Sequence, residues 1–279
     1  MKFDVNKYAR CFEIEPDEAC FWHGRTDGIG DEANAKSIAE EKVLKTLEMK
    51  LLEHREELET GGVEFELEDG AITIKYGTTK LEEQEFWDAC SKSFAEQAAG
   101  QIHVIEGTDL RRDGASEHEY AQSVWARIER RILAEKLTDP HNREVSDIMA
   151  IDPATGNEKG LINKDIIKQE LLSDKNQHIK LSKRISEETD SESLSSLKSQ
   201  QNETEIQYKT LKINAVRAGF FSEHELDGAL KSPMPSSPAE QLLIIESEHY
   251  LNKITPDDYK EITGHEMEVD RESGLEIER

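Results

Sequence analysis

The sequence has few cysteines, and their spacing fits neither a disulfide framework nor a metal centre. The three cysteines, Cys11, Cys20 and Cys90, are an odd number and include no C-x-x-C pair. We therefore expect the chain to fold without disulfides in a reducing cytosol. The nine histidines are scattered, and the stretch GHEMEVD near the C-terminus offers no defensible ligand geometry, so the sequence predicts no metal site.

Long apolar stretches and an excess of basic residues are also missing. No hydrophobic run approaches the length of a membrane span, and the start MKFDVNKYARCFEIEPDEAC lacks the apolar core of a secretory signal. The 60 acidic residues against 35 basic ones give a formal net charge of -25, which repels the phosphates of nucleic acids and anionic lipids. We therefore expect a cytoplasmic protein with neither nucleic acid nor a membrane as its partner.

Hydrophobic residues make up only 35% of the chain. This share is low for a fully globular protein and predicts a compact part beside a more solvated one. With 279 residues, the chain is long enough for one large domain or two ordinary ones. We place a boundary near the turn-rich stretch 151–160, which predicts a first domain over 1–158 and a second over 159–279.

The first domain is predicted to belong to the α/β (α+β) class. Residues 1–60 are interpreted as helical, because apolar residues in 31–58 recur at near-helical spacing up to a glycine-rich stop. Alternating residues on both sides of an Asp-Gly turn then predict a β-hairpin over 63–77. The domain therefore begins with helices and continues with a hairpin.

Residues 85–100 have a clear helical pattern. One apolar row begins at Phe86, and the neighbouring row holds Trp87 and Ser91. Short strands of a small buried sheet and an intervening helix are predicted after this segment, with strands over 101–107 and 145–152 and the helix over 123–137.

The second domain is predicted to be a helical, acidic module. Its stretch 186–205 is polar and rich in serine and glutamate, which is typical of an exposed helix or a linker, and we expect a polar linker there. Three helix starts follow, at Ser222, Ser237 and Thr255, each with an acidic residue three positions later. We expect a protein partner to bind through this module.

Four short stretches of the first domain carry side chains suited to one kind of chemistry. They contain all three tryptophans of the chain together with two carboxylates and a hydroxyl, namely Trp22, Trp87, Trp125, Glu48, Glu129 and Ser91. Aromatic side chains can form a platform for a flat heteroaromatic ring, and a nearby carboxylate can stabilise positive charge on the adjoining sugar. The set is suited to breaking a glycosidic bond to a base.

The order of these stretches resembles the ADP-ribosyl cyclase / NAD glycohydrolase family. Phe-Trp is followed by TLEMKLL, then by FWDACSKSFAEQAAGQIHVIEG, and then by an aromatic residue with Glu four positions later. The resemblance covers residues 20–152 and leaves the second domain unexplained. It implies an ADP-ribosyl cyclase-like fold, in which a helical N-terminal part packs on a small parallel-type sheet.

The resemblance also implies roles for particular side chains. Glu129 would be the catalytic carboxylate, which holds ribose hydroxyls and stabilises an oxocarbenium-like state. Trp22 and Trp87 would be the aromatic walls that position the nicotinamide. Ser91 would lie beside the reacting ribose carbon. Glu48 would contact the carboxamide and influence whether the intermediate meets water or its own adenine.

Two further positions take binding roles by the same resemblance, and a third is proposed from its side-chain chemistry. Trp125 would line the mouth of the pocket, Glu57 matches an acidic position in it, and Arg25 is expected to bind phosphate because a guanidinium suits that task. The chain departs from the family at Val124, where a phosphate-contacting hydroxyl is common, and in the HGR stretch that replaces the usual Ser-Arg pairing. The absence of the disulfides of animal members and the inserted hairpin indicate a microbial, disulfide-free branch.

The expected reaction is cleavage of NAD, as substrate and not as cofactor, into nicotinamide and ADP-ribose. Cyclic ADP-ribose stays open as a further product. Nicotinamide leaves a cationic ring as a neutral molecule, so the reaction needs no general acid. The alternative is a non-catalytic interaction protein that keeps this fold as a scaffold for the helical module. Taken singly, Glu129 could be one charge of a solvated helix face, and the tryptophans could serve packing alone.

The final stretch of the chain, 264–279, is acidic and rich in glutamate. It is similar to the export signals that type IV secretion systems read. This similarity implies a bacterial effector or toxin that is translocated into a host cell and depletes its NAD. A solubilising tail is the alternative interpretation.

Overall fold

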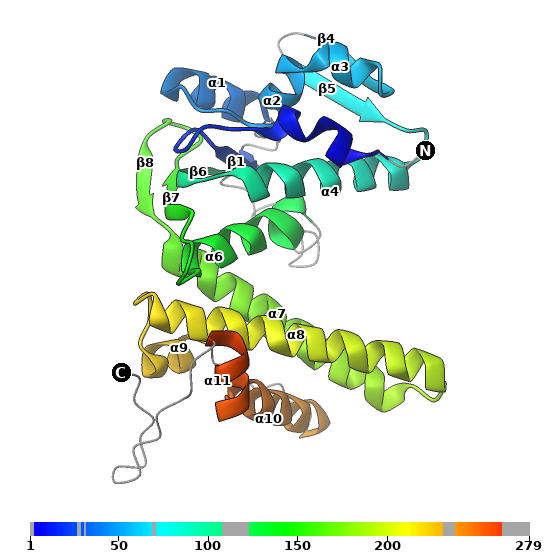
Figure 1. Ribbon diagram of the computed structural model, residues 1–279, viewed down its shortest axis with the longest axis vertical. Helices are drawn as coiled ribbons and strands as arrows, with labels where there is room; N and C mark the ends of the chain where they lie inside the picture. The colour runs from blue at the N-terminus through cyan, green and yellow to red at the C-terminus, as the bar shows by residue number, and fades with distance from the viewer. Residues whose placement is uncertain are drawn as a thin grey trace. The chain divides into compact units, whose positions relative to one another are not determined.

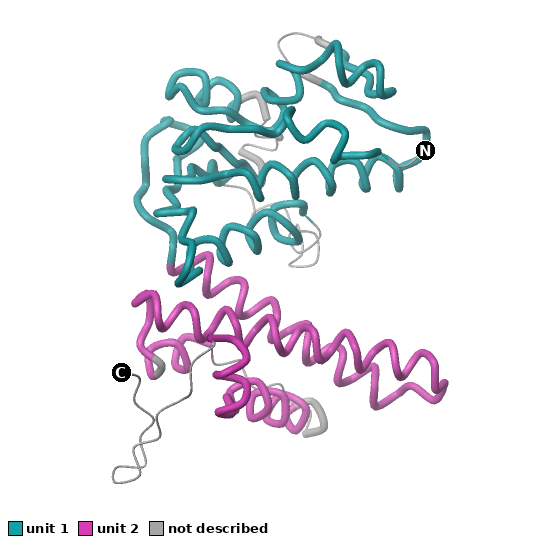
Figure 2. Tube along the Cα trace, viewed as in Figure 1, with its two compact units in different colours: residues 1–163 teal, residues 164–279 magenta. Residues whose placement is uncertain are grey.

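The computed structural model describes residues 3–26, 29–30, 32–68, 71–107, 123–230 and 238–263. The chain divides into two compact units, Met1–Asn163 and Lys164–Arg279 (Figure 2). The boundary predicted after residue 158 falls inside strand β8 (Glu158–Leu161), which pairs with its neighbour in the sheet of unit 1. The division therefore comes a few residues later than the turn-rich sequence indicates.

Unit 1 contains a four-stranded mixed sheet in the order β1-β6-β7-β8 (Figure 1). Its other strands are β1 (Cys20–His23), β6 (Gly100–Glu106) and β7 (Val145–Ile151). These three run parallel, and β8 lies antiparallel to β7. Ile102 and Val104 on β6 are fully buried, as expected for an inner parallel strand that is covered on both faces. The predicted α/β class and the strands at β6 and β7 are confirmed.

Strand β1 shows that the helical prediction for residues 1–60 is wrong in this part. Phe21 lies opposite Val104 in the parallel pairing with β6. The backbone N–H of Cys20 also donates to the carbonyl of Lys45 at 2.9 Å. Residues 20–23 lie outside the helically spaced stretch 31–58, and their aromatic side chains pack well on the pleated surface of a sheet.

The single helical run predicted over 31–58 is broken twice. The run consists of α1 (Glu32–Lys42), α2 (Leu47–Glu53) and α3 (Arg55–Glu59), and a further helical segment, η1 (Val5–Phe12), precedes it. Val43 takes a left-handed φ of 60°, which ends α1. Thr46 then caps α2 by accepting a hydrogen bond from the N–H of Met49 at 3.3 Å. His54, with φ -109° and ψ 21°, separates α2 from α3.

The hairpin and the helix after it agree with the prediction. Strands β4 (Val63–Glu68) and β5 (Ala71–Tyr76) pair antiparallel, and α4 (Lys80–Gln97) follows. A reciprocal capping box between Thr79 and Glu82 starts α4. The predicted apolar row that begins at Phe86 is fully buried, so this face of α4 anchors the helix in the core.

The helix predicted over 123–137 begins as a π-helical turn. This turn, η2 (Trp125–Glu129), continues directly into α6 (Arg130–Thr138). Single π-turns inside helices are frequent at functional sites. A small separate ladder is formed by β2 (Arg25–Thr26) and β3 (Ile29–Gly30).

Unit 2 consists of helices in the part that the structure describes. They are α7 (Asn163–Glu187), α8 (Ser191–Arg217), α9 (Glu223–Ala229), α10 (Pro238–Asn252) and α11 (Pro256–Thr263). Of the two interpretations of the polar stretch 186–205, the exposed helix is confirmed and the linker is wrong, because α8 begins at Ser191, where Asp190 accepts from the N–H of Ser193 at 2.8 Å. The caps at Ser222 and Thr255 are confirmed.

Two sequence predictions for this unit concern residues outside the described ranges. The cap at Ser237 and the acidic tail 264–279 both lie there. Within the described ranges, no helix combines the length and the apolar character that crossing a membrane requires.

Candidate active site

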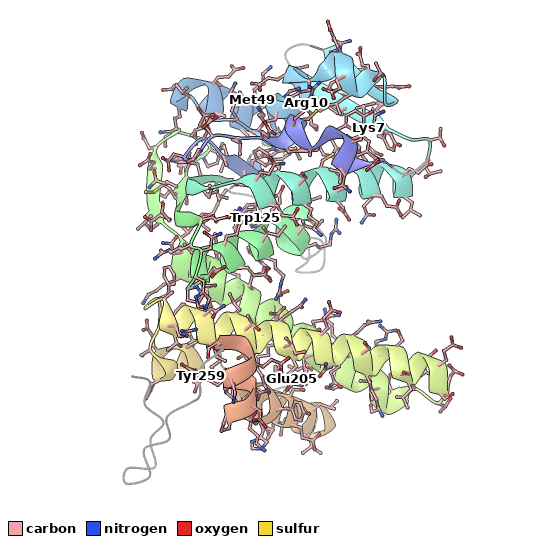
Figure 3. The ribbon with its side chains drawn as sticks, viewed as in Figure 1. Lys7, Arg10, Met49, Trp125, Glu205 and Tyr259 are labelled. Atoms are coloured by element: carbon pink, nitrogen blue, oxygen red, sulfur yellow. The ribbon has the colours of Figure 1, made fainter. Side chains whose placement is uncertain are left out.

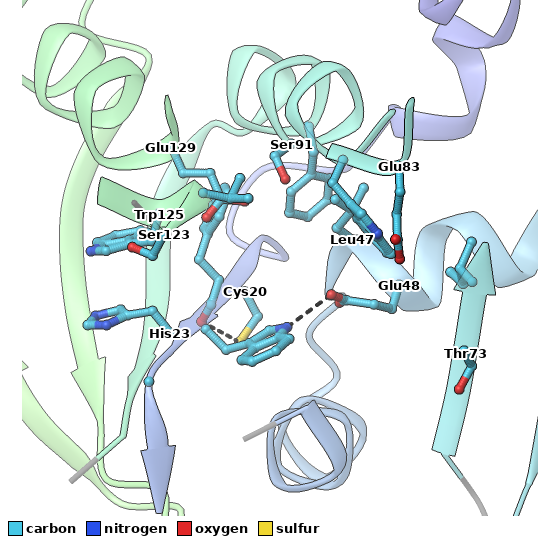
Figure 4. A pocket seen from close by; sticks show the side chains of 17 residues that line it. Cys20, His23, Leu47, Glu48, Thr73, Glu83, Ser91, Ser123, Trp125 and Glu129 are labelled. Atoms are coloured by element: carbon cyan, nitrogen blue, oxygen red, sulfur yellow. Dashed lines mark hydrogen bonds between the residues drawn. The ribbon is translucent and has the colours of Figure 1, made fainter. Parts of the chain in front are cut away.

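A cavity of about 440 Å³ in unit 1 gathers most of the side chains that the sequence singles out (Figure 4). Among the residues that line it are Trp22, Glu48, Trp87, Ser91, Trp125 and Glu129. They come from the first strand of the sheet and from three separate helical segments. Long-range folding therefore unites residues that are dispersed in the sequence.

Local structure explains how each side chain reaches the cavity. Strand β1 carries Trp22, and the Thr46 cap places Glu48 in the first turn of α2. Trp87 and Ser91 lie four residues apart on α4 and so share one face of that helix. The π-turn η2 supplies the remaining pair, with Glu129 as its last residue.

Glu129 is the most deeply buried carboxylate of the cavity, at 8% exposure. Burial raises its pKa to about 8, the nearby hydroxyl of Ser91 opposes the shift, and the charge of Glu48 adds to it. The carboxyl is therefore largely protonated at neutral pH while the cavity holds no cation. A positive charge placed beside it would favour the ionised form.

Glu48 lies across the cavity from Glu129 and is partly buried. Burial raises its pKa, while hydrogen bonds from its own backbone N–H, from Thr46 and from Trp22 oppose this shift. The indole Nε1–H of Trp22 donates to Oε1 of Glu48 at 3.1 Å. This bond fixes the indole ring and the carboxylate relative to each other.

The aromatic residues form walls at different depths. Trp125 is 3% exposed and stacks on His23, with ring centroids 5.0 Å apart and an interplanar angle of 9°. Trp22 and Trp87 are partly buried, and Trp87 packs edge-to-face on Phe86 at 5.5 Å. The resemblance places Trp125 at the mouth of the pocket, whereas its ring is almost fully covered here.

The cavity is acidic as well as aromatic. Its described lining includes Glu48, Glu83 and Glu129 and contains neither lysine nor arginine. Carboxylates and indole faces both attract cations. The arrangement can therefore orient a flat cationic ring and stabilise positive charge on the group attached to it.

Two predicted site residues are not placed in this cavity by the structure. Glu57 does not line it, because its carboxylate faces η1 and accepts hydrogen bonds from Nε and Nη2 of Arg10 at 3.0 and 2.6 Å. Figure 3 labels Arg10 on η1. Arg25 has its backbone in β2, and its side chain lies outside the described part of the structure.

The structure also adds lining residues that sequence reasoning missed. Thr73 and Ile74 of β5 form part of the wall, so the inserted hairpin contributes to the cavity. His23 lines it too, and its imidazole, whose Nε2 lies 3.8 Å from Oε1 of Glu106, lowers the pKa of that carboxyl. The sequence did contain a signal for His23, because this residue directly follows the predicted wall residue Trp22. The sequence offers no signal for the hairpin wall, which depends on tertiary packing.

Comparison with known proteins identifies no relative of this chain. Protein-family models, curated proteins and solved structures give no match to the chain. The functional argument therefore depends on the cavity and its side chains.

Proposed function

We propose that unit 1 is an NAD glycohydrolase, which breaks the bond between nicotinamide and ribose. The observation that supports this most is the buried carboxyl of Glu129, which lines the same cavity as Ser91 and has aromatic walls around it. The described lining offers carboxylates and no lysine or arginine, as suits the cationic nicotinamide ring. The largely parallel sheet is compatible with the ADP-ribosyl cyclase-like fold that the resemblance implies.

The reaction that this site would catalyse needs little acid–base chemistry. The C–N bond to nicotinamide breaks, the bonding electrons neutralise the ring, and the ribose carbon becomes cationic. Water then adds to that carbon and gives ADP-ribose and a proton. Ionised Glu129 would stabilise the cationic sugar, and Ser91 would help to hold that carboxylate in place.

Substrate binding would itself prepare the carboxylate. In the empty cavity, desolvation keeps Glu129 largely protonated, since its pKa is about 8. The positive nicotinamide ring would lower this pKa and favour the ionised form. Aromatic walls that exclude bulk water strengthen this attraction and orient the ring.

Incubating the purified full chain with NAD and measuring released nicotinamide by chromatography tests the proposal. We expect release by the wild type and a loss of about 10²–10³-fold or more in Glu129→Gln, because that variant keeps the shape and removes the charge. Glu135→Gln is the matched control, since Glu135 is exposed on α6 and pairs with Arg131. It should keep full activity.

The same assay distinguishes the alternative. If the folded wild type releases no nicotinamide, or if Glu129→Gln keeps full activity, unit 1 is better explained as a non-catalytic scaffold. The chromatogram also separates ADP-ribose from cyclic ADP-ribose. We propose ADP-ribose as the main product and Glu48 as the residue that influences this ratio, as the resemblance implies.

A further inference from the structure

A second cluster of reactive side chains lies outside the cavity of unit 1. Cys11 at the end of η1, His54 between α2 and α3, and Glu57 in the first turn of α3 each offer one ligand atom. These three atoms all lie within 4.8 Å of one another. None of the three residues lines the cavity that contains Glu129.

Local structure positions this cluster. The break at His54 ends α2 and starts α3, which places His54 and Glu57 three residues apart on one side of the new helix. Nδ1 of His54 lies 4.0 Å from Oε2 of Glu57. The buried Cys11 reaches the pair from η1, so two separate segments of unit 1 meet here.

The donor set identifies the kind of ion. A thiolate, an imidazole and a carboxylate are the ligands that zinc takes in proteins, whereas magnesium and calcium prefer oxygen alone. We propose that Cys11, His54 and Glu57 bind a zinc ion, with water as a fourth ligand. On binding, the S–H bond of Cys11 breaks, a Zn–S bond forms, and the proton goes to solvent.

Arg10 gives the cluster an outer support. Nε and Nη2 of Arg10 both donate to the same oxygen of Glu57, Oε2, at 3.0 and 2.6 Å. These bonds keep the carboxylate oriented, and the same Oε2 lies 4.0 Å from Nδ1 of His54. Carboxylates that bind metals are commonly held in this way by neighbouring hydrogen bonds. The positive charge of Arg10 is offset by the two anionic ligands of the site.

The cluster adjoins an open hollow at His54. This hollow has a volume of about 600 Å³. Its lining also includes Glu13, Glu15 and Glu18, whose negative charges attract cations, and the basic residues Arg10 and Lys50. The site therefore combines a buried thiol, a partly exposed imidazole and an adjoining hollow with acidic residues in its lining.

The proposed ion would join η1 to the α2–α3 segment. Because α2 also carries Glu48, zinc would stabilise one wall of the cavity without contacting it. This inference is independent of the proposed NAD chemistry. It requires only that zinc binds the folded chain more tightly than the unfolded one.

Titration of the reduced, chelator-treated full chain tests the proposal. Zn²⁺ is added in competition with a chromophoric chelator, and Co²⁺ is added alone as a spectroscopic probe. We expect one ion per chain, a near-ultraviolet band from thiolate bound to cobalt, and visible bands of tetrahedral cobalt. Cys11→Ala should remove the near-ultraviolet band and weaken zinc binding by about 100-fold or more, since even outer-shell changes can cost that much.

Matched variants separate this site from loss of folding. His54→Gln changes a partly exposed residue and should weaken zinc binding while the near-ultraviolet band persists at high Co²⁺. Cys20→Ala and Glu53→Gln remove a thiol and a carboxylate outside the cluster and should bind zinc like the wild type. Zinc binding that is absent in the wild type, or equally tight in Cys11→Ala and His54→Gln, would overturn the proposal.

Discussion

Two clusters of buried ionisable groups, one in each unit, differ in how their charges are paired. In unit 1, Glu129 and Glu48 line a cavity whose described lining contains no basic side chain other than histidine, and burial raises both pKa values. In unit 2, Lys209 is 5% exposed and lies 2.6 Å from Glu205 and 3.1 Å from Asp258. Burial opposes its charge, but these partners raise its pKa overall.

Other buried lysines of unit 2 are also paired with acidic side chains of other helices. Lys175 on α7 pairs with Glu248 on α10. Lys212 on α8 donates to Asp227 on α9 at 2.7 Å and to Asn252 on α10 at 3.0 Å. Each lysine therefore connects helices that are separate in the sequence. Such pairs fix how the helices pack against one another.

The comparison indicates where function resides. A buried charge with a full set of partners stabilises one arrangement of the chain and has little left to offer a ligand. A buried acid without a basic partner is unfavourable in the free protein, and it becomes favourable when a cation binds. By this criterion unit 1 is the part that would bind the cationic substrate of the proposed function, and the ion pairs of unit 2 would be structural.

The largest effect is expected from breaking a charge pair in unit 2. Lys209→Met removes the cation between Glu205 and Asp258 and leaves both carboxylates close together with no lysine between them. Removal of one partner of a buried pair commonly costs about 3–5 kcal/mol of unfolding free energy. Hydrogen exchange of the α8 backbone, measured by mass spectrometry on the full chain, should show this loss.

Lys198→Met is the matched control for that variant. Lys198 is exposed on the same helix, and its replacement should change the unfolding free energy by less than about 0.5 kcal/mol. Equal protection of α8 in both variants would show that the ion pairs of unit 2 are not structural. The contrast drawn between the two units would then not hold for unit 2.

A smaller effect of opposite sign is expected from Glu129→Gln in unit 1. The folded-state pKa of about 8 lies above the ordinary value of 4.5. The stability linked to the proton is therefore present below pH 4.5 and is lost as the pH rises through 8. Glu129→Gln has no such loss and should be more stable than the wild type by about 2–4 kcal/mol at pH 9.

Tryptophan fluorescence can measure this difference in the full chain. All three tryptophans, Trp22, Trp87 and Trp125, belong to unit 1. Urea unfolding followed by this signal at pH 5 and pH 9 should give nearly equal stabilities at pH 5 and the predicted gain at pH 9. The exposed control Glu135→Gln should show no gain. A Glu129→Gln variant less stable than the wild type at pH 9 would contradict the assignment of an unpaired buried acid.

The features that could be predicted from the sequence are those that neighbouring residues determine. The apolar row of α4, the Asp-Gly hairpin and the caps at Ser222 and Thr255 each depend on residues within a few positions. The cavity residues from Trp22 to Glu129 were found differently, through the order of motifs in a resemblance. The structure brings them together, which spacing alone could not predict.

The features that could not be predicted depend on distant partners. Strand β1 exists because β6 lies beside it, and the break at Val43 requires a left-handed backbone that the residue type disfavours. Glu57 was predicted to line the pocket, but its carboxylate accepts a hydrogen bond from Arg10, which belongs to a distant segment of the chain. The hairpin wall at Thr73 likewise appears only after the chain has folded.

The smallest predicted effect sharpens the comparison within unit 1. Trp22→Phe removes the indole N–H that donates to Glu48. That bond favours the ionised carboxylate, so its loss should raise the pKa of Glu48 further and cost about 1 kcal/mol at pH 8, but less at pH 4. Trp87→Phe replaces the other partly buried indole of the same cavity with a smaller ring and breaks no such bond to Glu48, so urea unfolding should show a cost that does not change with pH. The same pH dependence in both variants would mean that Glu48 is not held by Trp22, and that packing alone orders this wall.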